Sequence, residues 1–178
     1  MKDMDIANLR FVFWDSKFEE KYKDKLKERF MTFKLALNLF LQWNGRVIVE
    51  TGSQRSLKGG WEGDSNSTMV FGDYLSRYPG HLWTCDKESE VIETAKQRTR
   101  PFSQNITYVA EDSLKFLQRF TKTIDLLYLD SLDCPREGDA RKAQEHTLKE
   151  LQLSLPKLSV SGIVLLDDNW YKNGAKPL

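Results

Sequence analysis

The first quarter of the chain is patterned as one long amphipathic helix. Between Asp15 and Trp43, apolar side chains recur at steps of three and four residues, with lysines and glutamates on much of the opposite face. The apolar positions are Phe18, Tyr22, Leu26, Phe30, Phe33, Leu37 and Leu41. Asn44-Gly45 ends the pattern, as glycine ends many helices. Such a helix either packs on the sheet of the fold or serves as a lid or an oligomer contact.

Five short apolar segments follow, and they alternate with segments of helical periodicity. The predicted strands are Val47–Val49, His81–Asp86, Ile106–Val109, Ile124–Leu129 and Gly162–Leu166. Strands that alternate with helices form a parallel sheet with helices on both faces. We therefore predict an α/β fold with a doubly wound, mostly parallel sheet. We expect a single domain over residues 1–178, with residues 1–44 as a helical extension and residues 45–170 as the core.

Composition narrows the classes of function. The chain has 178 residues and a net charge of +1, which gives no electrostatic argument for a nucleic-acid partner. No apolar run approaches the roughly 20 residues that span a bilayer, so we expect no membrane segment. Two cysteines are too few for a disulfide framework, which favours a reducing compartment and a cytoplasmic location.

Acidic residues follow every predicted strand. Four strands end directly in an acid, and an acidic pair comes shortly after the third strand. The residues are Glu50, Asp86, Glu111-Asp112, Asp130 and Asp167-Asp168. Like charges gathered at one edge of a sheet repel one another unless something binds there. Because ligands of open α/β sheets bind beyond the carboxyl ends of the strands, we predict a ligand site at this edge.

Three of these strand ends form a recognisable set: Glu50-Thr51-Gly52 after the first strand, Asp86 at the end of the second, and Asp112-Ser113 after the third. They resemble class I S-adenosylmethionine-dependent methyltransferases, which have a Rossmann-like fold, and the resemblance covers about Arg46 to Trp170. It implies that Gly52 approaches the methionine part of the cofactor while Glu50 orders the loop and the amino group. Asp86 would bind both ribose hydroxyls, and Asp112 with Ser113 would bind the adenine. The implied activity is methyl transfer from S-adenosylmethionine.

The loop after Gly52 departs from the family pattern. The usual compact glycine loop is interrupted, and Gly63-Asp64 resembles its second half displaced by an insertion. Glu50 and Asp86 are therefore 36 positions apart (86 − 50), against the ~20 of dinucleotide-binding folds. Ser53, Gly63 and Asp64 remain the predicted cofactor contacts of this loop. The insertion is either a flap over the site or a tolerated surface loop.

A nicotinamide dinucleotide is the alternative cofactor, because an acid after the second strand also binds ribose in that class. Its phosphates need an uninterrupted Gly-x-Gly-x-x-Gly turn before the helix. Gly52 has no glycine two positions later, so the loop favours S-adenosylmethionine.

The fourth and fifth strand ends suggest the chemistry. Asp130, with Asp168-Asn169, resembles the ligand set of the metal-dependent catechol and caffeoyl-coenzyme A O-methyltransferases. This resemblance implies a magnesium ion bound by Asp130, Asp168 and Asn169, with Asp167 as a substitute ligand, and a small-molecule hydroxyl as methyl acceptor. Alternatively, these acids line a metal-free site. His146 is either structural or a general base. Asp130 is also a predicted catalytic residue and a predicted cofactor contact.

Two other functions stay open. The chain could be a cofactor-binding domain without transferase activity, or a nicotinamide-dependent or hydroxylase-like enzyme on the same scaffold. Class I domains add an antiparallel hairpin after the fifth strand, whereas only Tyr171–Leu178 remains here. We therefore expect either a truncated chain or a sheet edge that the N-terminal helix or a partner subunit covers, and we predict a homodimer.

Overall fold

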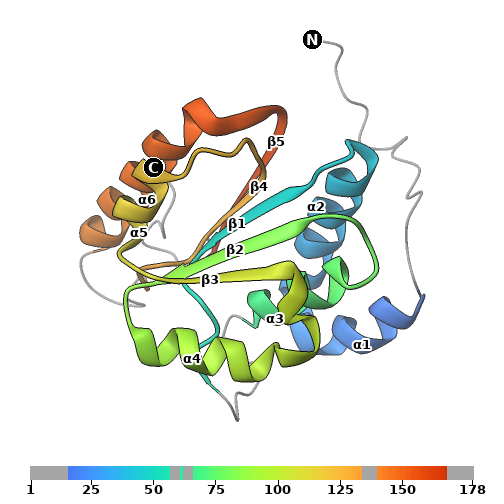
Figure 1. Cartoon of the computed structure of the whole chain (residues 1–178). Coiled ribbons are helices and arrows are strands. Elements are labelled where there is room, and N and C mark those ends of the chain that lie inside the picture. Colours follow the sequence, from blue (N-terminus) through green and yellow to red (C-terminus); the bar gives the residue numbers. More distant parts are fainter. Residues whose placement is uncertain (1–15, 57–60, 62–65, 134–139, 168–178) are drawn as a thin grey trace.

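The protein has a five-stranded sheet in which all strands run parallel (Figure 1). The computed structural model describes residues 16–56, 61, 66–133 and 140–167. The strands lie in the order β3-β2-β1-β4-β5. Their bounds are β1 (Val47–Thr51), β2 (His81–Asp86), β3 (Ile106–Ala110), β4 (Ile124–Leu129) and β5 (Leu158–Leu166). The direction of winding reverses between β1 and β4, which is where such sheets open a ligand crevice. The predicted doubly wound sheet is confirmed.

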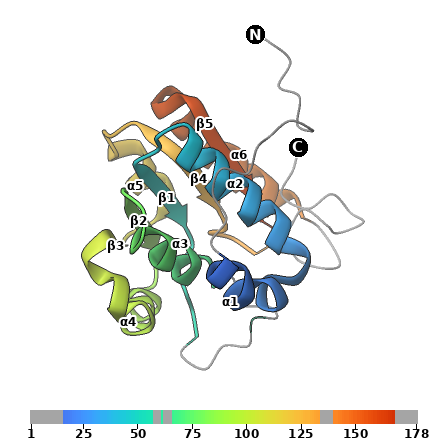
Figure 2. The same ribbon diagram turned by 90° about the vertical axis from the view of Figure 1, so that its right-hand side faces the viewer.

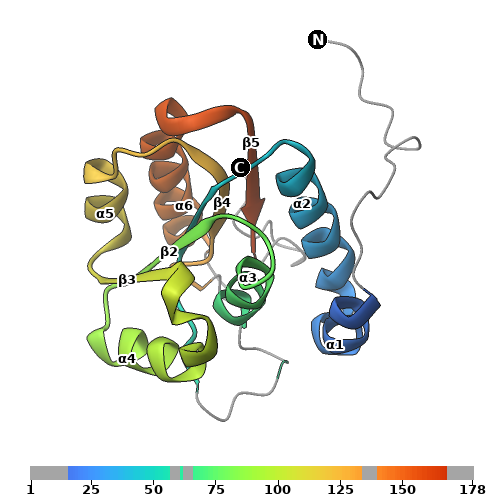
Figure 3. The ribbon, with the colours of Figure 1, turned by 45° about the vertical axis from the view of Figure 1, so that its right-hand side comes forward.

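Helices cover both faces of the sheet. The described helices are α1 (Ser16–Leu26), α2 (Phe30–Gln42), α3 (Ser67–Leu75), α4 (Ser89–Arg98), α5 (Ser113–Arg119) and α6 (Arg141–Ser154), with short 3-10 turns η2 (Lys27–Arg29), η3 (Arg100–Asn105) and η4 (Leu155–Lys157). In Figure 3, α2 and α3 lie on one side of the sheet and α5 and α6 on the other. Successive residues of a strand face opposite sides. Ile48 accordingly packs in the core beneath α2 and α3, and Val49 packs in the core beneath α5 and α6.

The N-terminal helix is broken, contrary to the single helix predicted from Asp15 to Trp43. The chain passes through the 3-10 turn η2, where Lys27 has a φ of +49°, a value that L-residues with side chains rarely adopt. The turn keeps Leu26 and Phe30 buried while α1 and α2 point in different directions (Figure 2). Phe33 of α2 packs on Tyr128 of β4, so the expected packing on the sheet holds for α2.

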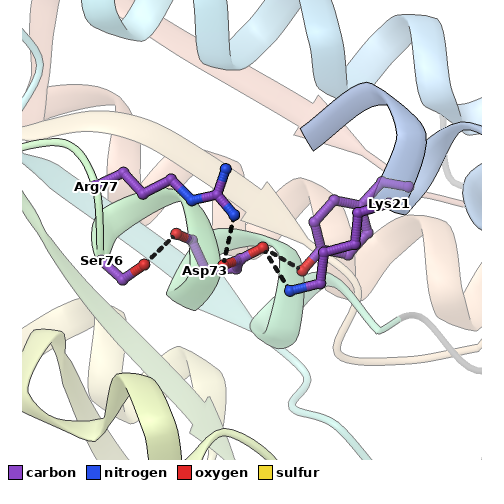
Figure 4. Close-up of polar contacts among 5 residues, drawn as sticks. Lys21, Asp73, Ser76 and Arg77 are labelled. Carbon is purple, nitrogen blue, oxygen red and sulfur yellow. Dashed lines mark hydrogen bonds and ion pairs between the residues drawn. The ribbon is translucent and has the colours of Figure 1, made fainter. Parts of the chain in front are cut away.

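Helix α1 is fixed to α3 by a nearly buried carboxylate. Asp73 accepts hydrogen bonds from Lys21 at 2.9 Å, from Tyr22 at 2.8 Å and from Arg77 at 3.4 Å. In Figure 4, Lys21 of α1 and Arg77 of the turn after α3 converge on Asp73. Burial, and then the charge of Asp73, raises the pKa of Tyr22, so the phenol stays protonated and donates. Trp61 packs edge-on against Tyr22 and ties the loop after β1 to the same helix.

The outer edge of β5 is uncovered within the part of the chain that the structure describes. The register between β4 and β5 shifts between Ile124 and Leu126, and Val160 is fully exposed. Residues 168–178, which bear on the missing hairpin, lie outside the described residues. The homodimer therefore stays a prediction. None of the described helices combines the length and the apolar character that a membrane crossing needs.

Candidate functional site

Gly52 makes the turn at the carboxyl end of β1. Its φ is +85°, and a Cβ added there would lie 2.2 Å from the carbonyl oxygen of Asp130, far inside van der Waals contact. The Gly52 N–H donates to the carbonyl of Cys85 at 2.8 Å, and the Asp130 N–H donates to the carbonyl of Thr51 at 2.9 Å. These bonds join β1 to its neighbours β2 and β4. Only glycine fits, and the turn lies at the point where the winding reverses.

Glu50, the predicted acid of the first motif, is completely buried. Its Oε2 accepts hydrogen bonds from the hydroxyl groups of Thr68 at 2.7 Å and Thr84 at 2.6 Å. Burial raises the pKa of Glu50 to about 7 against the opposing effect of the nearby hydroxyl groups of Ser67, Thr84 and Thr68. Its Oε1 has no hydrogen-bond partner among the described residues. Through Oε2, Glu50 joins β1 to α3 and β2 and so orders the loop, while Oε1 is the buried oxygen left without a hydrogen-bond partner among the described residues.

Asp86 ends β2 and holds the turn that follows Gly52. Its Oδ2 accepts the N–H of Ser53 at 3.2 Å, and its Oδ1 accepts the N–H of Glu88 at 3.0 Å. The hydroxyl of Ser53 hydrogen-bonds that of Thr84 at 2.6 Å. The carboxylate is half-buried, so one edge is open to an outside donor. An ionised carboxylate has several acceptor positions, so Asp86 can accept further hydrogen bonds beside these two.

Asp112 and Ser113 begin α5, directly beyond β3. Asp112 caps the helix by accepting the N–H of Lys115 at 3.2 Å, and Glu111 donates its N–H to the carbonyl of Asp86 at 2.9 Å. These two bonds place the Asp112-Ser113 pair beside the end of β2. The three motifs predicted from the sequence therefore share one edge of the sheet.

His146 lies behind this edge, on α6. Its Nε2 is 3.0 Å from the hydroxyl of Ser113 and 3.5 Å from Oε1 of Glu150, which is fully buried. Both contacts use the same ring nitrogen, whereas a relay to a base needs one partner on each nitrogen. The contacts of His146 therefore join it to the predicted adenine end. Its role as general base remains a prediction. The sequence showed only that His146 and Glu150 are four residues apart on one helix.

The carboxyl ends of β4 and β5 have a different character. Asp130 is nearly buried, and Oδ2 of Asp167 accepts hydrogen bonds from the hydroxyl of Tyr128 at 2.5 Å and from Arg29 at 2.9 Å. Burial lowers the pKa of the Arg29 guanidinium. The nearby groups Tyr128, Asp167 and Asp130 have the larger combined effect and raise that pKa. Arg29 was not anticipated, because it comes from η2, 138 positions before its partner. Asp167, the proposed substitute metal ligand, is thus already bound to two protein donors.

A second arginine, Arg55, joins the loop after β1 to the loop after β4. Arg55, three positions after Gly52, forms an ion pair with Asp133 in which NH1 and Oδ2 are 2.7 Å apart. This hydrogen bond raises the pKa of Arg55, and the charges of Asp130 and Asp86 add to the effect. In the sequence, Arg55 is marked only as a cation three residues after Gly52, within the interrupted glycine loop.

Comparison with protein families decides the class of the molecule. The model described as "Methyltransferase domain" matches residues 59–169, which is more than half of the chain. The chain belongs to this methyltransferase family. Comparison with curated protein sequences finds no match.

Solved structures show the same fold for the methyltransferase domain. The S-adenosylhomocysteine-bound methyltransferase PaMTH1 from Podospora anserina has a TM-score of 0.55 and 13% identity, over 85% of this chain and 58% of that one. SMU.1697c, described as a putative methyltransferase from Streptococcus mutans in complex with S-adenosylhomocysteine, has a TM-score of 0.53 and 10% identity, over 75% and 70%. The spermidine synthase of Thermotoga maritima has a TM-score of 0.51 and 16% sequence identity, over 83% of this chain and 47% of that one. The chain thus spans little more than half the length of PaMTH1.

The methyltransferase domain brings the described residues of the predicted cofactor site to one edge of the sheet. Within the residues that the structure describes, no three acidic, histidine or cysteine side chains are arranged to hold a metal ion. The predicted ligands Asp168 and Asn169 lie outside the described residues, as do Gly63 and Asp64 of the insertion.

Proposed function

We propose that this methyltransferase domain binds S-adenosylmethionine across the carboxyl ends of β1, β2 and β3. The observation that carries the proposal is the single edge formed by the Gly52 turn, the half-open carboxylate of Asp86 and the Asp112-Ser113 pair. Two proteins of similar fold, PaMTH1 and SMU.1697c, are described with bound S-adenosylhomocysteine, which supports the choice of cofactor.

Each residue has a role that follows from its surroundings. Asp86 accepts hydrogen bonds from the ribose hydroxyls, since its carboxylate is fixed by two backbone N–H groups and half open. Glu50 accepts the amino group through Oε1, which makes no hydrogen bond to a described residue although the hydroxyl of Ser67 is nearby. Gly52 lets the backbone approach the methionine part, and Ser53 fixes the turn. Asp112 and Ser113 bind the adenine.

We propose that the methyl acceptor is a hydroxyl group of a small molecule. Bound S-adenosylmethionine supplies a methyl group on a positively charged sulfur. The acceptor oxygen forms a bond to the methyl carbon, the carbon–sulfur bond breaks, and its electron pair stays on sulfur. Asp130, at the end of β4, takes up the hydroxyl proton in this scheme and orients the acceptor. The support for this part is the resemblance of the β4 and β5 ends to O-methyltransferases.

Magnesium assistance is the finer part of the same proposal. The oxygen ligands would be Asp130, Asp168 and Asn169, a set that suits a hard cation. The described residues do not form a metal site by themselves. Magnesium assistance can be tested by removing divalent ions with a chelator and then restoring Mg²⁺. A metal-assisted enzyme loses and regains methyl transfer without a change in affinity for S-adenosylhomocysteine.

Thermal unfolding with S-adenosylmethionine, S-adenosylhomocysteine and NAD tests the cofactor. Ligand at about 100 times Kd stabilises the fold by roughly 2.7 kcal/mol, which shifts Tm by about 5–10 °C for a chain of this size. We expect the shift with both adenosyl ligands and not with NAD. Asp86→Ala should abolish it. Since the fold also occurs in a spermidine synthase, transfer of a labelled methyl group must be measured as well. Binding without transfer to any hydroxyl compound would favour the cofactor-binding alternative.

A further inference from the structure

The proposed cofactor presents a carboxylate to a site that is mostly acidic. Its methionine end carries an amino group and a carboxylate, and its sulfur is positive. The acids Glu50, Asp86 and Asp130 suit the two positive groups. They repel the carboxylate, which needs a cation or several N–H donors at the same end of the site.

Arg55 is in the right place to supply that cation. It follows the Gly52 turn by three residues, and its guanidinium pairs with Asp133 at 2.7 Å. The same charge interacts with Asp130, whose backbone adjoins the Gly52 turn, and with Asp86. Arg55 therefore lies among the acids of the predicted site and not on a remote surface.

We propose that Arg55 binds the α-carboxylate of the cofactor's methionine end, exchanging its partner Asp133 for the ligand. This inference rests on the proposed function, since it needs an S-adenosylmethionine-type ligand.

The exchange is chemically easy. The side chains of Arg55 and Asp133 are 40% and 70% exposed, and ion pairs at such exposed positions contribute little stability. When released, Asp133 returns to water, where a carboxylate is well solvated. The planar guanidinium can bind either carboxylate with two parallel hydrogen bonds, so nothing in its geometry favours Asp133 over the ligand.

Arg29 is the rival cation, and its contacts argue against it. Its partner Asp167 has a side chain only 13% exposed and also accepts the hydroxyl of Tyr128. Withdrawing Arg29 would leave a nearly buried carboxylate without its ion pair, which is costly. Arg55 can leave its partner and Arg29 cannot leave as readily.

Calorimetric titration with two ligands tests the proposal. S-adenosylhomocysteine carries the α-carboxylate, whereas methylthioadenosine shares the adenosine and the thioether but lacks the amino-acid end. Arg55→Ala should weaken the affinity for S-adenosylhomocysteine by about 10- to 100-fold, which is the loss expected when a charge-assisted hydrogen bond is removed. The same variant should change the affinity for methylthioadenosine by less than about threefold. Equal losses for the two ligands, or no loss for either, would overturn the assignment.

Two further variants separate direct binding from a structural latch. If Arg55 served only to hold Asp133, Asp133→Asn would reproduce the loss seen in Arg55→Ala. We expect Asp133→Asn instead to bind S-adenosylhomocysteine at least as tightly as the unmodified chain. Arg119→Ala removes an arginine from an exposed ion pair with Glu111 of similar length, 2.8 Å, and should leave the ratio of the two affinities unchanged. Absence of S-adenosylhomocysteine binding to the unmodified chain would contradict the proposed function itself, not the role of Arg55 alone.

Discussion

The two halves of the carboxyl edge are built differently. At β1, β2 and β3, the acids are held by nearby backbone N–H groups and hydroxyls, as Asp86 is by Ser53 and Glu88. At β4 and β5, Asp167 is instead held by a distant guanidinium, that of Arg29, and by Tyr128. The first half is therefore held by groups at the ends of adjacent strands and at the start of α3. The second depends on how the N-terminal helices dock. We expect the first half to control cofactor binding and the second to control stability and acceptor chemistry.

The largest effect is expected from Gly52→Ala, which acts on the first half. The new methyl group meets the carbonyl of Asp130 at 2.2 Å in a backbone conformation with φ of +85°, so the turn must shift. We predict loss of S-adenosylhomocysteine binding by more than about 100-fold in calorimetric titration. Gly72→Ala in α3 is the matched control, because its nearest neighbour is a side-chain atom of Ile106 at 3.0 Å, and there we expect a change of less than about threefold. Comparable losses in both variants would mean that the Gly52 turn has no special role.

The pH dependence of stability is the second test, through Glu50. Its folded pKa of about 7 lies above the unfolded value of 4.5, so the native state binds protons more tightly than the unfolded state. Glu50 therefore stabilises the fold fully below about pH 4.5, and that contribution is lost as pH rises through 7. Urea unfolding of the unmodified chain, relative to Glu50→Gln, should show a decline of up to about 3 kcal/mol over this window. A difference that is constant with pH would show that Glu50 is not the titrating group.

Glu50 should also link pH to ligand binding. An amino group at Oε1 favours the ionised carboxylate, so affinity for S-adenosylhomocysteine should rise as pH rises through 7. This rise should be absent in Glu50→Gln, and its persistence there would assign it to another group.

A smaller effect is expected from Arg29→Met in the second half. The change removes the partly buried ion pair with Asp167, and we expect a loss of about 1–2 kcal/mol in urea unfolding, between the values typical of exposed and buried pairs. Affinity for S-adenosylhomocysteine should stay within about threefold. A large loss of affinity would show that the two halves are not separable.

The sequence anticipated residues at the strand ends of the first half, but not the contacts that hold either half together. Gly52 and Asp86 could be predicted because each lies directly at the end of a strand. A run of apolar residues followed at once by an acid or a glycine is visible in consecutive positions of the sequence. The break at Lys27 could not, since the apolar spacing continues through it and only three-dimensional packing turns the chain there. The contacts that side chains make could not be predicted either. Arg29 and Asp167 are 138 positions apart, Ser53 and Asp86 are 33 apart, and no periodicity joins either pair.

A crystal structure of the chain with S-adenosylhomocysteine tests the central claim most directly. The account predicts adenine against Asp112 and Ser113, ribose hydroxyls on Asp86, and the amino group at Oε1 of Glu50. A ligand bound at the ends of β4 and β5, with Asp86 still facing water, would contradict it.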